Sequence, residues 1–395
     1  MGRSTAAARE AALSPVEPDR FPRLLDDFRE RLDRELEAWI AAKRREAESA
    51  PAGQSGPTGL PELIDGVAGL VARGGKRLRP ALVYHTYRAC GGTSDETALP
   101  VAMATELLHT YLLIHDDIMD HAEVRRGQPS AHARFREAHR ARGLQGNAED
   151  FGRSVAILLG DLAHTYAVEL FLSAAPGSAR AAELTRCFSA MCQEVIGGQY
   201  LELLIAQRGG HPEGRQESRP ESIETELLAI LRLKSGLYTA DRPIQLGALL
   251  AGASPALLDG LSRYGSAVGE AFQLQDDLLG MFGDAGTVGK PVGADLKEGK
   301  FTFLIHHALA AASPAEREVL EAALGDPDLS DAEVERARKL LETTGARAAV
   351  ERMIAERLQA AREALASLAG LQASLQEDGR LFLEGLIDYL RERER

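Results

Sequence analysis

The amino-acid sequence predicts an all-α protein. Alanine and leucine dominate its 395 residues, only 5% are aromatic, and runs of Val, Ile and Thr are few. This composition favours helices over strands. Apolar residues also recur at helical spacing over long stretches, beginning with the segment from Phe21 to about Glu48. The length allows one large domain or two.

We expect residues 1–20 to form a disordered tail, because they contain Ala, Arg and Pro without apolar periodicity. Residues 21–395 are expected to form a single all-α domain. The segment 208–222 is rich in Gly, Pro and charge, which predicts a mobile loop. Helical periodicity resumes at Ile223, so this loop is placed within the domain.

The net charge of −13 argues against a nucleic-acid partner, although local cations can still bind an anionic substrate. The three cysteines match no metal-ligand spacing. Without a secretory leader they indicate reduced thiols in a cytoplasmic protein. The most apolar window, 155–175, contains Asp161, His164 and Glu169, which favours a buried helix over a stable membrane span.

A basic, glycine-containing segment precedes the third expected helix. Gly74 and Gly75 allow the backbone to approach an anion closely. Lys76 and Arg79 are three residues apart and would point the same way if the turn continues as a helix. The alternative interpretation is a basic helix end that interacts with its macrodipole.

The next expected helix ends in an acidic cluster formed by Asp116, Asp117 and Asp120. Asp116 and Asp120 lie one turn apart on one face, where like charges cost a bare helix about a few tenths of a kcal/mol. A divalent cation between them would offset that cost. Carboxylates suit Mg²⁺, which usually also takes waters and substrate phosphates. A solvated acidic face is disfavoured because the preceding turns are apolar.

Cations follow the acidic cluster. Arg125 and Arg126 are suited to a diphosphate, because guanidinium groups contact phosphate oxygens bidentately. His109 precedes Asp116 by seven residues, or two helical turns, which predicts a shared face. Lys234 lies within a later apolar helix, where a lysine often extends its ammonium to solvent.

A second acidic cluster interrupts another apolar helix. Asp276 and Asp277 are adjacent there, and Gln273 lies one turn before them. The glycine-rich segment that follows carries Lys290 and Lys300. Two acidic clusters, each followed by cations, together with the upstream basic segment, form a specific combination.

These residues resemble the trans-isoprenyl diphosphate synthases, also called polyprenyl synthetases. The resemblance covers roughly residues 60–310. The matching motifs are, in chain order, Gly75–Arg79 (Gly-Lys-x-x-Arg), His109, Asp116–Asp120 (Asp-Asp-x-x-Asp), Arg125–Pro129 (Arg-Arg-Gly-x-Pro), Lys234–Gly236, Phe272–Asp277 (Phe-Gln-x-x-Asp-Asp), Lys290 and Lys300.

The resemblance implies a fold and a site. The fold is an all-α barrel of about a dozen helices around a deep central cavity, usually homodimeric. The implied Mg²⁺ ligands are Asp116, Asp120 and Asp276. Residues implied to bind the allylic diphosphate are Arg125, Lys234, Gln273 and Lys290, with Asp117 and Lys300 completing the catalytic and substrate-binding sets. Residues implied to bind isopentenyl diphosphate are Lys76, Arg79, His109 and Arg126. One departure is Gly280, which stands where the family usually has Asp.

The implied reaction is the Mg²⁺-dependent, head-to-tail condensation of isopentenyl diphosphate with an allylic diphosphate. Tyr111 and Leu112 precede the first cluster by five and four residues, and would lie deeper in the cavity. A single bulky residue at Tyr111 resembles geranylgeranyl diphosphate synthases, with Tyr111 as the floor of the tail pocket. A farnesyl or longer-chain product is the alternative, as is an ordinary core tyrosine.

Other functions remain as alternatives. A terpene cyclase of the same fold would not need the second diphosphate site of Lys76, Arg79 and His109. A di-iron protein would use Glu106 and His109 but requires a second such pair, and no other histidine has a Glu three residues before it. An inactive partner subunit or a helical scaffold is a non-enzymatic alternative, although a scaffold would bury cations at a cost.

Overall fold

The computed structural model describes residues 20–49, 59–174, 180–208, 220–283, 292–368 and 375–392. The predicted N-terminal tail lies outside this part of the chain, except for Arg20, which begins the first helix. Residues 209–219 of the predicted mobile loop and Lys290 also lie outside it. The loop is shorter than predicted at its C-terminal end, because a helix already begins at Pro220.

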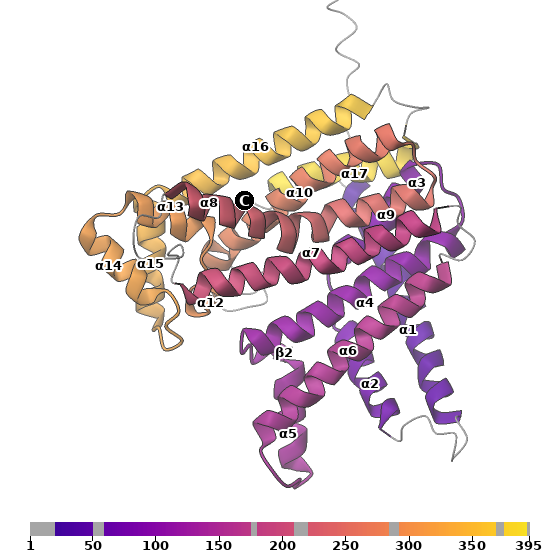
Figure 1. The fold of residues 1–395 in the computed structure, drawn as a ribbon, viewed down its shortest axis with the longest axis horizontal. Helices are drawn as coiled ribbons and strands as arrows, with labels where there is room; N and C mark the ends of the chain where they lie inside the picture. The colour runs from indigo at the N-terminus through magenta and orange to yellow at the C-terminus, as the bar shows by residue number, and fades with distance from the viewer. Residues whose placement is uncertain are drawn as a thin grey trace, which may run out of the picture.

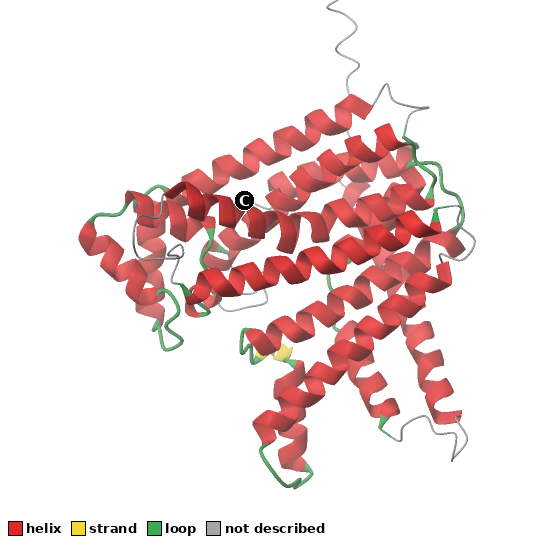
Figure 2. Cartoon of the chain, viewed as in Figure 1, coloured by secondary structure: helices red, strands yellow, loops and turns green. Residues whose placement is uncertain are grey.

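Helices account for nearly all of the described chain, so the all-α prediction is confirmed (Figure 1, Figure 2). The strands among the described residues are one short antiparallel pair. In chain order the elements are α1 (Arg20–Ser49), α2 (Leu60–Val71), α3 (Leu78–Ala89), α4 (Asp95–Met119), β1 (Val124–Arg125), β2 (Gln128–Pro129), α5 (Ala131–Ala141), α6 (Ala148–Ala174), α7 (Ala181–Gln207), α8 (Pro220–Ile230), the π-helix η1 (Leu231–Asp241), α9 (Arg242–Leu250), α10 (Pro255–Phe282), α12 (Ala294–Lys297), α13 (Phe303–Ala311), α14 (Pro314–Ala323), α15 (Asp331–Thr343), α16 (Ala346–Ser367) and α17 (Glu377–Glu392).

The long helices α4, α6, α7, α10 and α16 form the body of the molecule (Figure 1). α4 packs along α6, and α10 packs between η1 and α16. Leu107, Leu108 and Leu159 are completely buried where α4 meets α6. Each such side chain contributes about 1.5–3 kcal/mol relative to an exposed one. Both acidic clusters therefore stand on helices that the core holds rigidly.

Two of these helices, α4 and α6, are long and apolar enough to cross a membrane by length and composition alone. The most apolar windows of α4 and α6 are 67% and 44% buried within the protein. Core helices of soluble proteins have the same properties, so this is weak evidence for a membrane span.

The C-terminal helix α17 ties α3 to α10. The ring of Phe382 stacks on His85 of α3 with centroids 4.0 Å apart. Gly379 allows α17 to contact the α3 backbone, where a Cβ would collide. On its other side, the Tyr264 hydroxyl of α10 donates a hydrogen bond to the carbonyl of Leu383 at 2.6 Å. α17 thus joins the basic segment before α3 to the helix that carries the second acidic cluster.

Protonation of His85 should make the free energy of unfolding of the chain depend on pH. Burial lowers the pKa of His85 to about 3, so below pH 6.5 the unfolded chain binds a proton that the folded chain excludes. We expect this group alone to lower the free energy of unfolding by about 2 kcal/mol between pH 7 and pH 5. His85→Phe should keep the ring stack and remove this contribution. Urea unfolding of both chains across this pH range checks the expectation, and parallel pH profiles would contradict it.

Candidate active site

The π-helix η1 carries Lys234 into the interior, and glycines of its neighbours hold it there. π-Helical turns occur often at functional sites. A Cβ on Gly198 of α7 would lie 2.8 Å from the Cα of Lys234, and one on Gly269 of α10 would lie 2.8 Å from the Cα of Gly236. No side chain fits at either position, so η1 lies in backbone contact with both helices. The direction of the Lys234 side chain follows from that contact.

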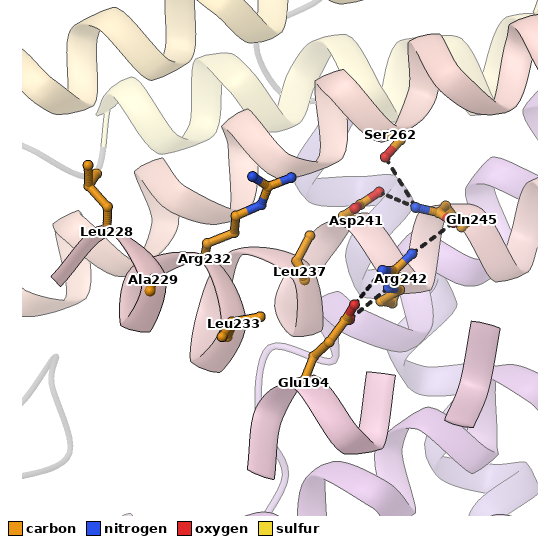
Figure 3. Close-up of a pocket in the computed structure, with 10 residues that line it drawn as sticks. All are labelled: Glu194, Leu228, Ala229, Arg232, Leu233, Leu237, Asp241, Arg242, Gln245 and Ser262. Atoms are coloured by element: carbon orange, nitrogen blue, oxygen red, sulfur yellow. Dashed lines mark hydrogen bonds and ion pairs between the residues drawn. The ribbon is translucent and has the colours of Figure 1, made fainter. Parts of the chain in front are cut away.

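The outer flank of η1 borders a cavity of about 570 Å³ (Figure 3). Arg242 donates to both carboxylate oxygens of Glu194, at 2.8 and 2.5 Å. Gln245 donates to Asp241 at 2.8 Å and to Ser262 at 3.1 Å. These polar groups satisfy one another, and none of the predicted site residues lines this cavity. Through Arg242 and Gln245, these hydrogen bonds connect the C-terminal end of η1 to α7 and α10.

The first acidic cluster lies at the C-terminal end of α4, and its three carboxylates differ in their partners. Asp117 is buried and accepts a hydrogen bond from Nε of Arg125 at 2.7 Å. Arg125 also donates to Asp116 at 3.2 Å. Burial opposes the charge of Arg125, but the three carboxylates of the cluster, Asp117 foremost, together outweigh it and raise the pKa of the guanidinium. Asp120 caps the helix. Asp117 therefore positions Arg125 beside Asp116.

The second acidic cluster stands on α10 and is joined to η1 by an amide. The Gln273 side chain donates to Asp277 at 2.7 Å and accepts from the Ser235 hydroxyl at 2.7 Å. Burial, and next the negative charge of Asp295, raise the pKa of Asp277 to about 8. Burial and the nearby carboxylate of Asp295 therefore both favour the protonated, neutral form of Asp277.

The ammonium of Lys300 joins the first acidic cluster to Asp295 of α12, which lines the same small cavity as Asp277 of the second cluster. Its Nζ lies 2.8 Å from Asp120 and 3.5 Å from Asp295. Burial opposes its charge, but the surrounding carboxylates hold the pKa of Lys300 well above its usual value. A small cavity of about 90 Å³ lies beside this pair, lined by residues of α7, η1, α10 and the segment around Lys300. This arrangement joins residues that are 180 positions apart in the chain.

Lys234 makes a second link of the same kind. Its ammonium forms an ion pair with Glu202 of α7 and lies 3.9 Å from Asp116. The interpretation of Lys234 as a residue that reaches solvent is therefore wrong. Sequence reasoning missed Glu202, which follows Gly198 by one helical turn and so faces η1. That spacing is a signal only once the contact between α7 and η1 is known.

A separate cationic pocket forms where α3, α4 and η1 meet. Arg79 donates to the Thr239 hydroxyl at 2.8 Å, lies 3.5 Å from Nε2 of His109 and stacks on the Tyr238 ring at 4.4 Å. Nδ1 of His109 lies 2.8 Å from the Tyr238 hydroxyl. Burial and then the charge of Arg79 lower the pKa of His109 well below 6.5, so its imidazole is neutral at pH 7.

Arg126 enters this pocket from the turn between β1 and β2. Its guanidinium packs against Gly75, where a Cβ would lie 2.7 Å from a guanidinium nitrogen. The glycine therefore makes room for a cation, in addition to its backbone freedom. Burial, reinforced by nearby arginines, lowers the pKa of Arg126, although Glu106 acts in the opposite sense. The pocket thus brings the guanidinium groups of Arg79 and Arg126 together, with Glu106 as a nearby carboxylate.

Lys76 and Arg79 do not share a helical face, so that prediction is wrong. Arg77 between them has a left-handed backbone with φ of 50°, and α3 begins only at Leu78. Lys76 is exposed, with its ammonium 5.9 Å from the Tyr389 ring of α17. The basic segment therefore presents its two cations to different neighbours.

The Glu106–His109 alternative lacks support for a di-iron centre. Glu106 forms a buried ion pair with Arg77, whereas Nδ1 of His109 lies beside the Tyr238 hydroxyl, so the two side chains have different partners. Within the described residues no three His, Cys, Asp or Glu side chains are grouped to hold an ion by themselves. A cation in the acidic site would thus need oxygens from a ligand or water, which is the usual coordination of Mg²⁺ in phosphate-binding enzymes.

The two predicted chain-length residues lie on α4 beside the core. The Tyr111 ring is half-buried, with centroids 4.8 Å from His115 and 5.1 Å from His164 of α6. Leu112 is also half-buried against the core. Tyr111 is thus held by aromatic neighbours on two helices.

The chain is similar to known proteins over most of its length. Residues 61–341 match the profile of the polyprenyl synthetase family. The chain is 35% identical to a geranylgeranyl diphosphate synthase of Mycobacterium tuberculosis over 291 residues, covering 74% of this chain and 75% of the relative. It is 31% identical to a geranylfarnesyl diphosphate synthase of Aeropyrum pernix over 338 residues, covering 84% and 95%.

A solved structure is similar over nearly the whole length. It is the geranylgeranyl pyrophosphate synthase from Corynebacterium glutamicum complexed with isoprenyl diphosphate and magnesium. The two structures superpose with a TM-score of 0.83 at 31% identity, covering 93% of this chain and 99% of that one.

The backbone contact of η1 predicts opposite effects for two adjacent glycines of α7. Gly198→Ala should lower the free energy of unfolding by about 1–3 kcal/mol, because the methyl group meets the backbone at Lys234. Gly197 has open space around its Cβ position, so Gly197→Ala should raise stability by about 0.5–1 kcal/mol. The midpoints of urea unfolding of the two variants check this. Shifts in the same direction would show that α7 and η1 are not in backbone contact.

Proposed function

The chain belongs to the polyprenyl synthetase family, and on that premise we propose roles for its own residues in the reaction. The protein is a prenyltransferase that condenses isopentenyl diphosphate with an allylic diphosphate. The observation that carries the assignment of residues is the ammonium of Lys300 between Asp120 of the first cluster and Asp295 beside the second. A separate cationic pocket lies where α3, α4 and η1 meet. A reaction of two diphosphate substrates needs two separate places to bind them, and the structure offers these two.

We assign the allylic diphosphate to the acidic clusters, with Mg²⁺ as the metal. Asp116, Asp120 and Asp276 are its proposed ligands, because their hard carboxylate oxygens suit Mg²⁺ and leave positions for phosphate oxygens. When bound, Mg²⁺ stabilises the negative charge that develops on the departing diphosphate. Magnesium in the relative from Corynebacterium glutamicum supports this choice of metal.

The cations around the clusters are proposed to bind the same diphosphate. Each of three cations is paired with a carboxylate of the first cluster, namely Lys234, Lys300 and Arg125. A diphosphate bound beside that cluster would offer its oxygens to the same cations. Gln273 completes this set, and Lys290 is retained in it by resemblance. Asp117 acts through Arg125, which makes it a positioning residue rather than a metal ligand.

Isopentenyl diphosphate is assigned to the cationic pocket of Arg79, His109 and Arg126, and Lys76 is included by resemblance although it lies outside that pocket. Burial, and next the positive charges of Arg79 and Arg126, lower the pKa of His109, and those charges favour a diphosphate there. A neutral His109 donates or accepts one hydrogen bond without adding charge. The apolar residues of α4 and α6 exclude water from the carbocation formed when the allylic diphosphate departs.

The product is proposed to be geranylgeranyl diphosphate, with Tyr111 as the floor of the tail pocket. The relatives include both geranylgeranyl and geranylfarnesyl diphosphate synthases, so family membership leaves the chain length open. The aromatic neighbours of Tyr111 support a rigid floor, because His115 and His164 hold its ring from two helices.

A homodimer and a cytoplasmic location are also proposed. Support for the dimer comes from exposed apolar side chains on two adjacent helices, namely Ile157, Leu158 and Leu172 of α6 and Ile196, Tyr200 and Leu203 of α7. Support for the location comes from the three cysteines, all of which are free thiols.

Removal of one proposed metal ligand tests the acidic site. We expect Asp116→Asn to lower kcat on the order of a hundredfold or more. The substitution removes a proposed metal ligand, so the negative charge on the leaving diphosphate would be less well stabilised. The substitution keeps the side-chain shape and should leave the unfolding temperature within a few degrees. Condensation is measured with isopentenyl diphosphate and an allylic primer at saturating Mg²⁺. Turnover close to that of the unchanged chain would refute the assignment.

Enlargement of the tail pocket tests the floor. We expect Tyr111→Ala to lengthen the product by at least one isoprene unit, because removal of the ring opens space beyond it. Tyr111→Phe keeps the ring and should keep the product. Mass spectrometry of the products from each short primer distinguishes these cases, and an unchanged product from Tyr111→Ala would place the floor elsewhere.

A further inference from the structure

The second acidic cluster lacks a carboxylate one turn after Asp276, where the chain has Gly280. Gly280 is buried, and a Cβ built on it would lie 2.8 Å from Oδ2 of Asp295. The carboxylate of Asp295 therefore occupies the space that a side chain at position 280 would take. Asp295 comes from another element, α12, which lies 15 residues further along the chain.

Backbone hydrogen bonds hold Asp295 beside Gly280. The amide of Gly293 donates to the carbonyl of Gly280 at 3.0 Å, which fixes the start of α12 on α10. Gly293 has φ of 79°, a left-handed conformation that favours glycine, and the chain turns there into α12. Two residues later Asp295 faces the cluster, and the amide of Lys300 donates to its carbonyl at 2.9 Å.

The carboxylate of Asp295 is also part of the charge balance of the site. Its Oδ1 lies 3.5 Å from Nζ of Lys300, the ammonium that contacts Asp120 of the first cluster. Its side chain is 27% exposed, which leaves it open to a ligand. Asp295 lines the same small cavity as Asp277 and Lys234. The sequence alone indicates no role for Asp295, which lies in the glycine-rich segment between Lys290 and Lys300.

We propose that Asp295 supplies the carboxylate that position 280 lacks, so that α10 and α12 together build the second metal-binding cluster, with Gly280 making room. This inference rests on the proposed metal and diphosphate site. It predicts that the carboxylate can be moved from one element to the other, because a side chain at position 280 would begin next to the carboxylate of Asp295.

The test measures metal binding without catalysis. Mn²⁺ is titrated into the full chain at saturating inorganic pyrophosphate, and free Mn²⁺ is counted by electron paramagnetic resonance. Asp295→Asn keeps the shape of the side chain and should weaken Mn²⁺ affinity about 10–100-fold, the usual cost of removing a group that ligates or orients a metal site. Affinity within twofold of the unchanged chain would overturn the proposal.

The exchange variant tests the equivalence of the two positions. Gly280→Asp combined with Asp295→Ala should restore Mn²⁺ affinity to within about threefold of the unchanged chain, since a single carboxylate again occupies the shared space. Asp295→Ala alone is the reference for this rescue. A double variant no better than that reference would overturn the proposed exchange.

Two controls separate the possible failures. Asp328→Asn removes an exposed carboxylate in the connection between α14 and α15, and should leave affinity unchanged. Thermal unfolding without metal shows that each variant is folded. If the unchanged chain itself binds no Mn²⁺ with pyrophosphate, the proposed metal site fails; if it binds and Asp295→Asn binds equally well, only the present inference fails.

Discussion

The arrangement of the site depends on the pairing of buried like charges with shared cations. Carboxylates of α4, α7, α10 and α12 converge on one region, and their mutual repulsion would separate these helices if no cation lay between them. Lys300 joins Asp120 to Asp295, and Lys234 joins Asp116 to Glu202. In the proposed function both ammonium groups contact a diphosphate. The same cations would then serve both the packing of these helices and the binding of an anionic substrate.

Glycine contacts between helices give this charge arrangement its geometry. The π-helix η1 reaches the interior because Gly198 and Gly269 remove the side chains that would separate it from α7 and α10. Gly75 makes room for Arg126 in the cationic pocket, and Gly280 makes room for Asp295 in the acidic one. At each of these positions the function of glycine is steric, since it lets a charged group or its backbone approach closely.

The two proposed diphosphate sites differ in how they balance charge. In the acidic site burial, and next the charge of Asp295, raise the pKa of Asp277 to about 8, and the carboxylates there suit a divalent cation. The cationic pocket has guanidinium groups in excess and a histidine kept neutral by Arg79 and by burial. We therefore propose that one site takes its anion together with metal, whereas the other takes its anion directly. This proposed asymmetry suits a two-substrate condensation rather than a reaction with a single diphosphate.

Sequence alone determined the helical class and the local spacing of the motifs, because both depend on residues within a few turns. Gln273 and Asp277, four residues apart, do share a helical face and a hydrogen bond. The tertiary structure decided which distant groups meet. The pairing of Lys234 with Glu202, and the place of Asp295 beside Gly280, join separate elements and leave no periodic signal in the sequence. The left-handed backbone at Arg77, which separates Lys76 from Arg79, occurs where the Arg77 side chain is buried against Glu106, a contact that the spacing of the cations does not indicate.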